Sequence, residues 1–165
     1  MKKLFIILSL AMVLPMVANA QKIGFVNYQE IVSQMPELKA VEAQMDTLTQ
    51  QYEGEFLKMR QELENKYKEY QANAETMPES IKEVRASEIG ELQQRIEMFQ
   101  QTAQTDLQNK QRSLMEPVIN KLKEAISAVG KDNGYTYIFD ATAMLYTGND
   151  ADDVQPLVKA KLGLK

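Results

Sequence analysis

The sequence predicts an α+β fold in which a long antiparallel α-helical coiled-coil hairpin projects from a small β-rich body. Apolar and aromatic residues recur every three or four positions from Leu38 to Tyr70, so they form one stripe along a helix. A second stripe follows the break at Met77-Pro78 and extends from Val84 to Val118. Facing positions, such as Met59 and Ile96, keep a constant sum of residue numbers, as an antiparallel hairpin requires. Short β-branched and aromatic segments near both ends of the chain supply the strands of the body.

The first 20 residues have the pattern of a secretory signal peptide. Met1-Lys2-Lys3 is basic, a mostly apolar run extends from Leu4 to Val17, and Ala18-Asn19-Ala20 is a small-x-small cleavage site. The alternative is a membrane anchor, but the run contains Pro15 and is short for a bilayer span. We therefore expect cleavage before Gln21, no stable membrane insertion, and a mature protein located in the periplasm.

The composition argues against several classes of function. Removing Lys2 and Lys3 from the 19 basic residues leaves 17 against 23 acidic residues, and this net charge of −6 disfavours binding to nucleic acid. The sequence has no His and no Cys, which removes the usual nucleophile–base pairs, the commonest metal ligands and disulfides. Asn149–Asp153 lacks the glycine and the distant glutamate of a calcium loop. We expect no enzymatic activity, no cofactor and no metal site.

The first elements of the mature chain are a strand, a short helix and the outgoing helix of the hairpin. Ile23–Tyr28 is β-branched and aromatic and predicts the first strand. One or two helical turns are expected from Gln29 to Met35. Pro36 suits the first position of the outgoing helix, because no hydrogen bond is lost there. This helix is expected to extend to about Glu75.

The tip and the return helix follow. Residues 76–80 are expected to form the tip, because Pro78 disfavours helical geometry at Met77 and then suits a new helix start. The return helix is expected to continue to about Gly130. Pro117 lies inside it and is expected to kink it at the root of the arm.

After the hairpin the chain returns to the body. Tyr135–Asp140 predicts a second strand and Met144–Tyr146 a short third one, and a polar loop with acidic helix-start residues leads into a short helix through Val154 and Leu162. The expected division is a signal peptide at 1–20, a body formed by 21–35 and 132–165, and an arm formed by 36–131 with its tip near 76–80.

This body is too small for a large core, and its strands leave open edges. Association between chains is the simplest way to cover them, so oligomerisation is expected. The candidates for the oligomer contact are apolar side chains of the two predicted strands: Ile23, Phe25, Tyr137 and Phe139.

The order of several motifs around the hairpin resembles the Skp/OmpH family of periplasmic chaperones. Ile23-Gly24-Phe25-Val26-Asn27 resembles the first strand of that family. The resemblance covers essentially the whole mature chain. Further motifs match in order and spacing: Pro117-Val118-Ile119, Gly134-Tyr135, Ile138-Phe139-Asp140, Leu145-Tyr146 and Asp152-Asp153-Val154.

The resemblance implies a homotrimer with one shared β-rich trimerisation body and three hairpins around a cavity. It also implies an ATP-independent holdase that binds unfolded outer-membrane proteins and prevents their aggregation. This chain is acidic, whereas well-known members of the family are basic, and residues 62–95 contain eight acidic and five basic residues. Capture of clients by charge and binding of lipopolysaccharide are therefore not expected. The alternative function is a structural coiled-coil spacer or adaptor of the cell envelope.

Four residues of the arm are candidates for contact with clients. Met98 is next to the seam residue Phe99 and so points off the seam, and Met77 lies at the tip. Methionine side chains adapt to irregular partners. Tyr67 and Tyr70, near the tip, offer apolar rings whose hydroxyls can stay in water.

Two glycines interrupt otherwise strong helix-forming segments. Gly54 and Gly90 each cost up to about 1 kcal/mol relative to alanine in a helix. They either act as hinges that let the arms splay or are simply tolerated, and the sequence leaves both interpretations open.

Overall fold

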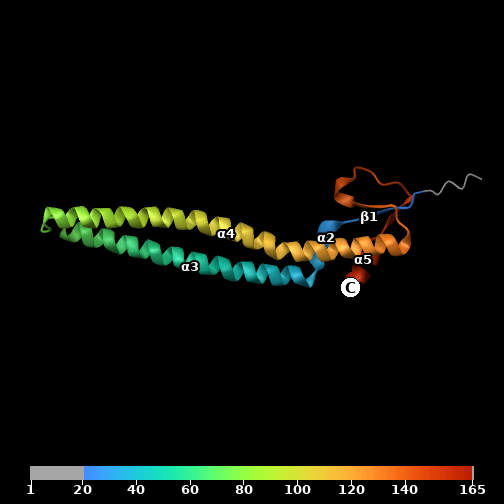
Figure 1. The fold of residues 1–165 in the computed structure, drawn as a ribbon, viewed down its shortest axis with the longest axis horizontal. Helices are drawn as coiled ribbons and strands as arrows, with labels where there is room; N and C mark the ends of the chain where they lie inside the picture. Colours follow the sequence, from blue (N-terminus) through green and yellow to red (C-terminus); the bar gives the residue numbers. More distant parts are fainter. Residues whose placement is uncertain (1–20, 165) are drawn as a thin grey trace, which may run out of the picture.

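The computed structural model describes residues 21–164, and the expected signal peptide lies outside this range. Two long antiparallel helices form an arm that extends from a small body, where both ends of the described chain meet (Figure 1). This arrangement confirms the predicted fold class of a helical hairpin on a small strand-containing body. In chain order the elements are β1 (Ile23–Val26), α2 (Tyr28–Gln34), α3 (Pro36–Asn73), α4 (Glu79–Asn133), β2 (Tyr137–Asp140), the 3-10 helix η1 (Ala141–Ala143), β3 (Ala151–Asp153) and α5 (Gln155–Leu162).

A proline marks the start of each arm helix. Pro36 is the first residue of the 38-residue α3, and Pro78 immediately precedes the 55-residue α4. α4 stays helical through Pro117 and ends at Asn133, and the following Gly134 has a φ of 71°, the left-handed conformation that favours glycine. Figure 1 shows α4 bending, without a break, where its colour passes from yellow to orange. α4 therefore continues from the tip of the arm into the body as one helix.

The seam between α3 and α4 has the antiparallel register that the stripes predict. The rings of Tyr52 and Phe99 pack edge to face with 5.9 Å between centroids. Nearer the tip, Lys66 Nζ lies 3.1 Å from the Glu88 carboxylate. Both pairs lie within about one helical turn of the expected facing positions.

Burial along this seam is unequal. On α3, Val41 at the root is the only buried residue, and the rest of the stripe is half-buried or exposed. The prediction that Val84 belongs to the seam is wrong, because it is 54% exposed. Its distance of five residues from Ile89 turns it well away from the stripe on a helix of 3.6 residues per turn. On α4 the buried seam residues are Ile89, Leu92, Ile96 and Ala103.

The body contains a three-stranded parallel sheet in the order β2-β1-β3. Two of its strands, β1 and β2, are shorter than predicted. β1 stops before Tyr28, because Asn27 Oδ1 accepts a hydrogen bond from the amide of Glu30 and so caps α2. β2 begins at Tyr137 rather than Tyr135, because the amide of Tyr135 donates to a carbonyl of the last turn of α4.

The third strand lies at Ala151–Asp153 and not at Met144–Tyr146, so that prediction is wrong. Alanine and aspartate are depleted in strands, and the local sequence therefore does not indicate one. Pairing with the central strand decides the position: Asp153 lies opposite Phe25, and the amide of Val154 donates to the Phe25 carbonyl at 3.0 Å.

The hydrophobic core of the body gathers side chains from several elements. Leu122 belongs to α4 and packs with Val118, Ala125 and Val129 of the same helix, so the core extends into residues that the expected division assigned to the arm. The sheet approaches this core closely at Gly24, where a Cβ would lie 2.8 Å from Val154 Cγ1. The most deeply buried side chains of the core are Ile31, Met35, Leu122, Val154 and Val158.

Candidate functional site

One face of the sheet is largely uncovered in the described residues. Paired residues of neighbouring strands point to the same face, and Ile23 pairs with Tyr137 while Phe25 pairs with Phe139. The alternate residues of β1 are buried on the opposite, core-facing side. The structure therefore brings together the four residues predicted for oligomerisation. We call the surface formed by Ile23, Phe25, Tyr137 and Phe139 the open face.

The open face exposes aromatic surface to solvent. Tyr137 and Phe139 are 53% and 46% exposed, and their rings stack with 5.8 Å between centroids. Ile23 and Phe25 are half-buried beside them. Parallel sheets are normally covered on both faces, and exposed apolar patches mark interaction sites. The open face is therefore the candidate surface for association between chains.

Two more exposed apolar side chains lie in the loop after η1 and were not among the predicted candidates. Leu145 is fully exposed and Tyr146 is 85% exposed. Figure 1 shows the segment after β2 on the side of β1 that faces away from α4. Two large apolar residues next to a polar loop could have indicated an exposed contact surface. The predicted strand at Met144–Tyr146 included them instead.

The arm exposes large apolar side chains, both off the seam and, at Tyr67, within the predicted stripe of α3. Met98 is 62% exposed and Tyr67 is 50% exposed, so both predicted contact residues are accessible. Leu57 is 65% exposed and was not predicted. Its position next to the seam residue Phe56 is the same signal that indicated Met98, and it was available from the sequence.

The two other predicted contact residues, Tyr70 and Met77, are half-buried at the tip. They border a small depression together with Lys66, Arg85 and Glu88. Lys66 Nζ and Arg85 Nη1 lie 3.1 and 3.0 Å from Glu88 Oε2, and these hydrogen bonds lower the pKa of Glu88. The structure thus separates the four candidates into an exposed pair on the arm and a partly covered pair at its tip.

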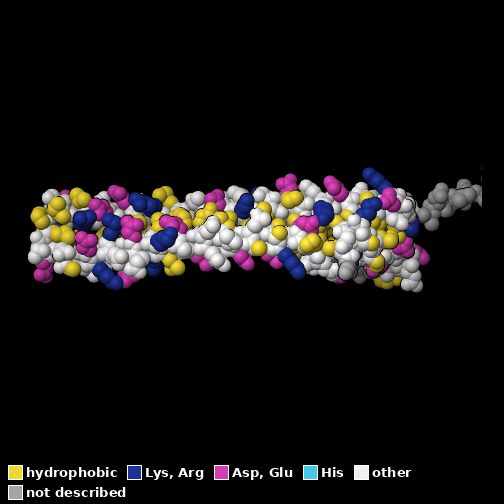
Figure 2. All heavy atoms as spheres, turned by 90° about the horizontal axis from the view of Figure 1, so that it is seen from below, with side chains coloured by type: hydrophobic (Ala, Val, Ile, Leu, Met, Phe, Trp, Pro, Cys, Tyr) yellow, Lys and Arg dark blue, Asp and Glu magenta, His cyan; other side chains and the backbone are white. Residues whose placement is uncertain are grey.

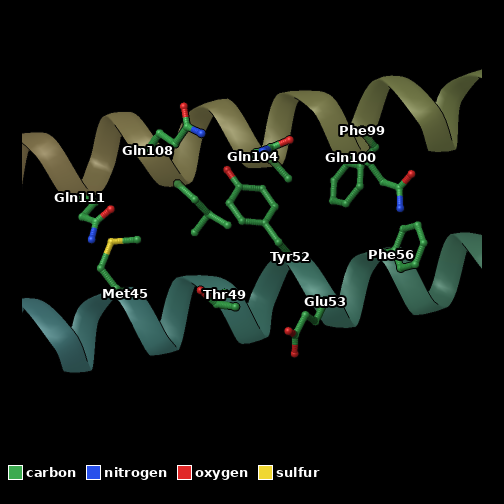
Figure 3. A pocket seen from close by; sticks show the side chains of 12 residues that line it. Met45, Thr49, Tyr52, Glu53, Phe56, Phe99, Gln100, Gln104, Gln108 and Gln111 are labelled. Carbon is green, nitrogen blue, oxygen red and sulfur yellow. The ribbon is translucent and has the colours of Figure 1, made fainter.

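A groove of about 470 Å³ opens between α3 and α4 in the middle of the arm (Figure 3). We call it the mid-arm groove. Ala103 is a small residue in a seam of larger ones, and the space beside it is not filled. The apolar and aromatic residues that line the groove are Met45, Tyr52, Phe56, Phe99, Ala103 and Leu107.

Tyr52 crosses the seam at this groove. Its hydroxyl donates a hydrogen bond to Asp106 Oδ2 at 3.0 Å, and this bond raises the pKa of Tyr52 above its ordinary value of 10.0. Its ring also packs on Phe99, so contacts with α4 hold the side chain at two points. Figure 3 shows the ring reaching from α3 toward α4, where it forms one wall of the groove.

Two features are absent from residues 21–164: a metal-binding group and a membrane-spanning helix. Within that range no group of three or more carboxylates is placed to hold a metal ion. No helix in the same range combines the length and apolar character needed to cross a bilayer. Figure 2 shows apolar side chains distributed along the arm and the body among lysines, arginines, aspartates and glutamates.

Comparison with known proteins agrees with the fold and extends along nearly the whole chain. The profile of the family described as Outer membrane protein (OmpH-like) matches residues 22–162. The chaperone protein Skp of Photorhabdus luminescens is 31% identical over 153 residues, which cover 89% of this chain and 91% of that protein. The Skp of Pectobacterium atrosepticum is 25% identical over 162 residues, covering 96% and 98% respectively.

The fold also resembles a solved structure. The crystal structure of an OmpH-like outer membrane chaperone from Caulobacter crescentus matches with a TM-score of 0.73 at 20% identity. The match covers 86% of this chain and 83% of that one. The two chains therefore share the fold of a helical hairpin on a small body.

Proposed function

The chain belongs to the OmpH-like family, which includes the Skp chaperones, and we propose that it is a periplasmic holdase for unfolded outer-membrane proteins. It binds these clients without ATP, does no covalent chemistry, and prevents their aggregation. The observation that carries the proposal is the exposure of Leu57, Tyr67 and Met98 along the arm. Leu57 and Met98 lie off the contact face of the two helices, and Tyr67 keeps about half of its surface exposed within the stripe, so all three are available to a third molecule.

The mechanism is physical. An unfolded barrel protein exposes apolar strand segments that would otherwise meet each other. The arms offer many weak apolar contacts instead, and several such contacts on one client multiply into a useful affinity. Release follows when the client reaches a more favourable folded state, so no nucleotide is needed.

We infer that three chains join through their open faces to form the shared body, with Ile23, Phe25, Tyr137 and Phe139 as the oligomer contacts. A parallel sheet with one uncovered face and a stacked exposed aromatic pair supports this arrangement. The trimer would place three arms around a common cavity. In that assembly the apolar residues of three arms act on one client.

Apolar contact, rather than charge, holds the client in this proposal. The segment around the tip, residues 62–95, carries eight acidic and five basic residues, so it does not attract acidic clients or lipopolysaccharide. Exposed charges more than about 8 Å apart are largely screened at physiological ionic strength. Apolar contact is not screened in this way.

The experiment is dilution of a urea-unfolded outer-membrane barrel protein into a solution of the mature chain. Light scattering and the mass of the soluble species are measured, with a folded protein of similar size and charge as the control. We expect suppressed scattering and a complex of three chains with one client. A structural spacer or adaptor would leave the scattering of the barrel protein unchanged, and that result would reject the holdase.

A further inference from the structure

The mid-arm groove combines its apolar lining with a regular row of amides on α4. Gln100, Gln104, Gln108 and Gln111 line the groove on this helix, and all four are exposed. Their spacing of four, four and three residues keeps them on one face of the helix. We call them the amide row. Glutamine is a good helix former, so such residues are common on solvated faces, and the position beside an apolar groove is what distinguishes this set.

The spacing of the amide row matches the repeat of an extended chain. Four residues of an α-helix rise about 6 Å. Two residues of an extended strand rise about 6.6 Å. Every second peptide group of a segment lying along α4 would therefore meet one glutamine. A glutamine side chain carries both a donor and an acceptor, so it can pair with the N–H and C=O groups that an unfolded strand leaves without partners.

The floor of the groove suits the side chains of the same segment. Phe56, Phe99 and Leu107 present apolar surface, and Ala103 leaves the space between them. In a segment whose side chains alternate, every second one points to the same side. Strands of outer-membrane barrels alternate apolar and polar residues over about 10 positions, which suits an apolar floor.

The charge of the groove restricts its occupant. Glu53 is the only residue with a formal charge among the twelve that line it. A neutral or weakly basic segment is therefore compatible with the groove, whereas an acidic segment is repelled. The row spans eleven residue steps, about 17 Å, which corresponds to about five residues of extended chain.

We propose that the mid-arm groove binds an extended, uncharged segment with alternating apolar and polar residues, such as a membrane strand of an unfolded outer-membrane barrel. The apolar floor takes alternate side chains, and the amide row pairs with the backbone. The inference rests on the proposed holdase function and adds the site, the conformation and the charge of the segment that is held.

The first test measures binding of three fluorescent ten-residue peptides to the mature protein by anisotropy. One alternates valine, leucine and tyrosine with serine and threonine, the second is its scramble, and the third has glutamate at the polar positions. We expect the alternating neutral peptide to bind best. The variant Q100A/Q104A/Q108A should weaken this binding about tenfold or more, because several modest hydrogen bonds are lost together.

The matched control is Q50A/Q71A/Q94A, three exposed glutamines of the arm that do not line the groove. Alanine favours helix in both variants, so circular dichroism should show unchanged helix content. Control affinity equal to wild type is expected. Equal affinity for all three peptides, or unchanged binding by the groove variant, would overturn the inference.

The second test locates a full-length client on the arm. Because the sequence has no cysteine, Gln104→Cys and Asn109→Cys each give a single attachment point for a benzophenone label. Asn109 is exposed and does not line the groove, so it is the control. We expect an unfolded barrel protein to crosslink at position 104 and much less at position 109.

Equal crosslinking at both positions would overturn the groove, even if the wild type suppresses aggregation in the same samples. If the wild type fails to suppress aggregation, the proposed holdase function itself is wrong. The two failures are therefore distinguishable.

Discussion

The body and the arm contain similar apolar side chains but bury them to different extents. In the body, five side chains from α2, α4 and α5 or their flanking residues are less than 2% exposed. In the arm, α3 buries Val41 alone, and its other stripe residues keep part of their surface in water. A core residue of the body is surrounded by several elements, whereas an arm residue has one partner helix. The arm therefore leaves apolar surface available for contact with other molecules, whereas the body encloses its apolar side chains in a core.

The largest expected effect comes from one substitution made in both regions. Leu122→Ala removes a fully buried side chain of the body and should lower the free energy of unfolding by about 3–5 kcal/mol. Leu92→Ala in the seam should cost about 2 kcal/mol, because half-buried α3 side chains can close over the gap. Urea titrations at one fixed protomer concentration measure both. Equal losses would contradict the comparison.

The second prediction concerns the open face. Phe139→Asp should shift the protein from trimer to monomer, because it places a charge in the proposed contact while changing a residue that is 46% exposed in the single chain. Leu57→Asp, at a more exposed position on the arm, is the control and should leave the trimer intact. Mass measured by light scattering after size exclusion decides the outcome. A monomeric wild type at micromolar concentration would reject the assembly.

The third prediction separates the two pairs of contact candidates. Tyr67→Ser with Met98→Ser should weaken protection of an unfolded barrel more than Tyr70→Ser with Met77→Ser, because the first pair is exposed and the second is half-buried. Aggregation assays measure both. Protection by the wild type should persist in about 0.5 M salt, where exposed charges are screened over a few ångströms. Loss of protection in salt, with both variants unchanged, would indicate capture by charge.

The fourth prediction is that glycine-to-alanine changes have opposite signs in the two regions. Nothing lies within 4 Å of a Cβ built at Gly54 or Gly90, so alanine there should stabilise the arm by up to about 1 kcal/mol each. At Gly24 the Cβ would meet Val154, so alanine should destabilise the body. Thermal unfolding followed by circular dichroism measures these changes. Impaired protection by the stiffened arm variants would favour the hinge interpretation over simple tolerance.

The smallest expected effect is a dependence on pH. Lys159 Nζ lies 2.9 Å from Glu30 Oε1, and hydrogen bonds from Gln155 and Lys159 lower the pKa of Glu30 below its ordinary value of 4.5. A lowered folded-state pKa stabilises the protein above the ordinary value, and this contribution is lost as pH falls through the lowered pKa. Acid titration of stability should therefore be less steep in Glu30→Gln. Glu64→Gln, which removes a local pair with Lys68 on the arm, should leave the unfolding of the body unchanged.

Much of the candidate site was accessible from the sequence, because contact residues next to a seam position are recognised by helical spacing. Met98 and Leu57 carry the same signal beside Phe99 and Phe56, although only Met98 was predicted. The mid-arm groove was not predictable in this way. It depends on how Tyr52 is held by Asp106 and on the space beside Ala103, and these are contacts between two helices.

The hairpin could be predicted from local sequence patterns alone. Pro36, Pro78 and the apolar stripes act through local backbone geometry and helical spacing, which do not depend on the rest of the chain. Three features depend instead on contacts between distant elements: the position of β3, the contribution of Leu122 to the core of the body, and the alignment of Phe25 with Phe139 on one face. Phe25 and Phe139 are 114 positions apart in the chain (139 − 25), and no local pattern encodes which partner a short strand or a helix end will meet.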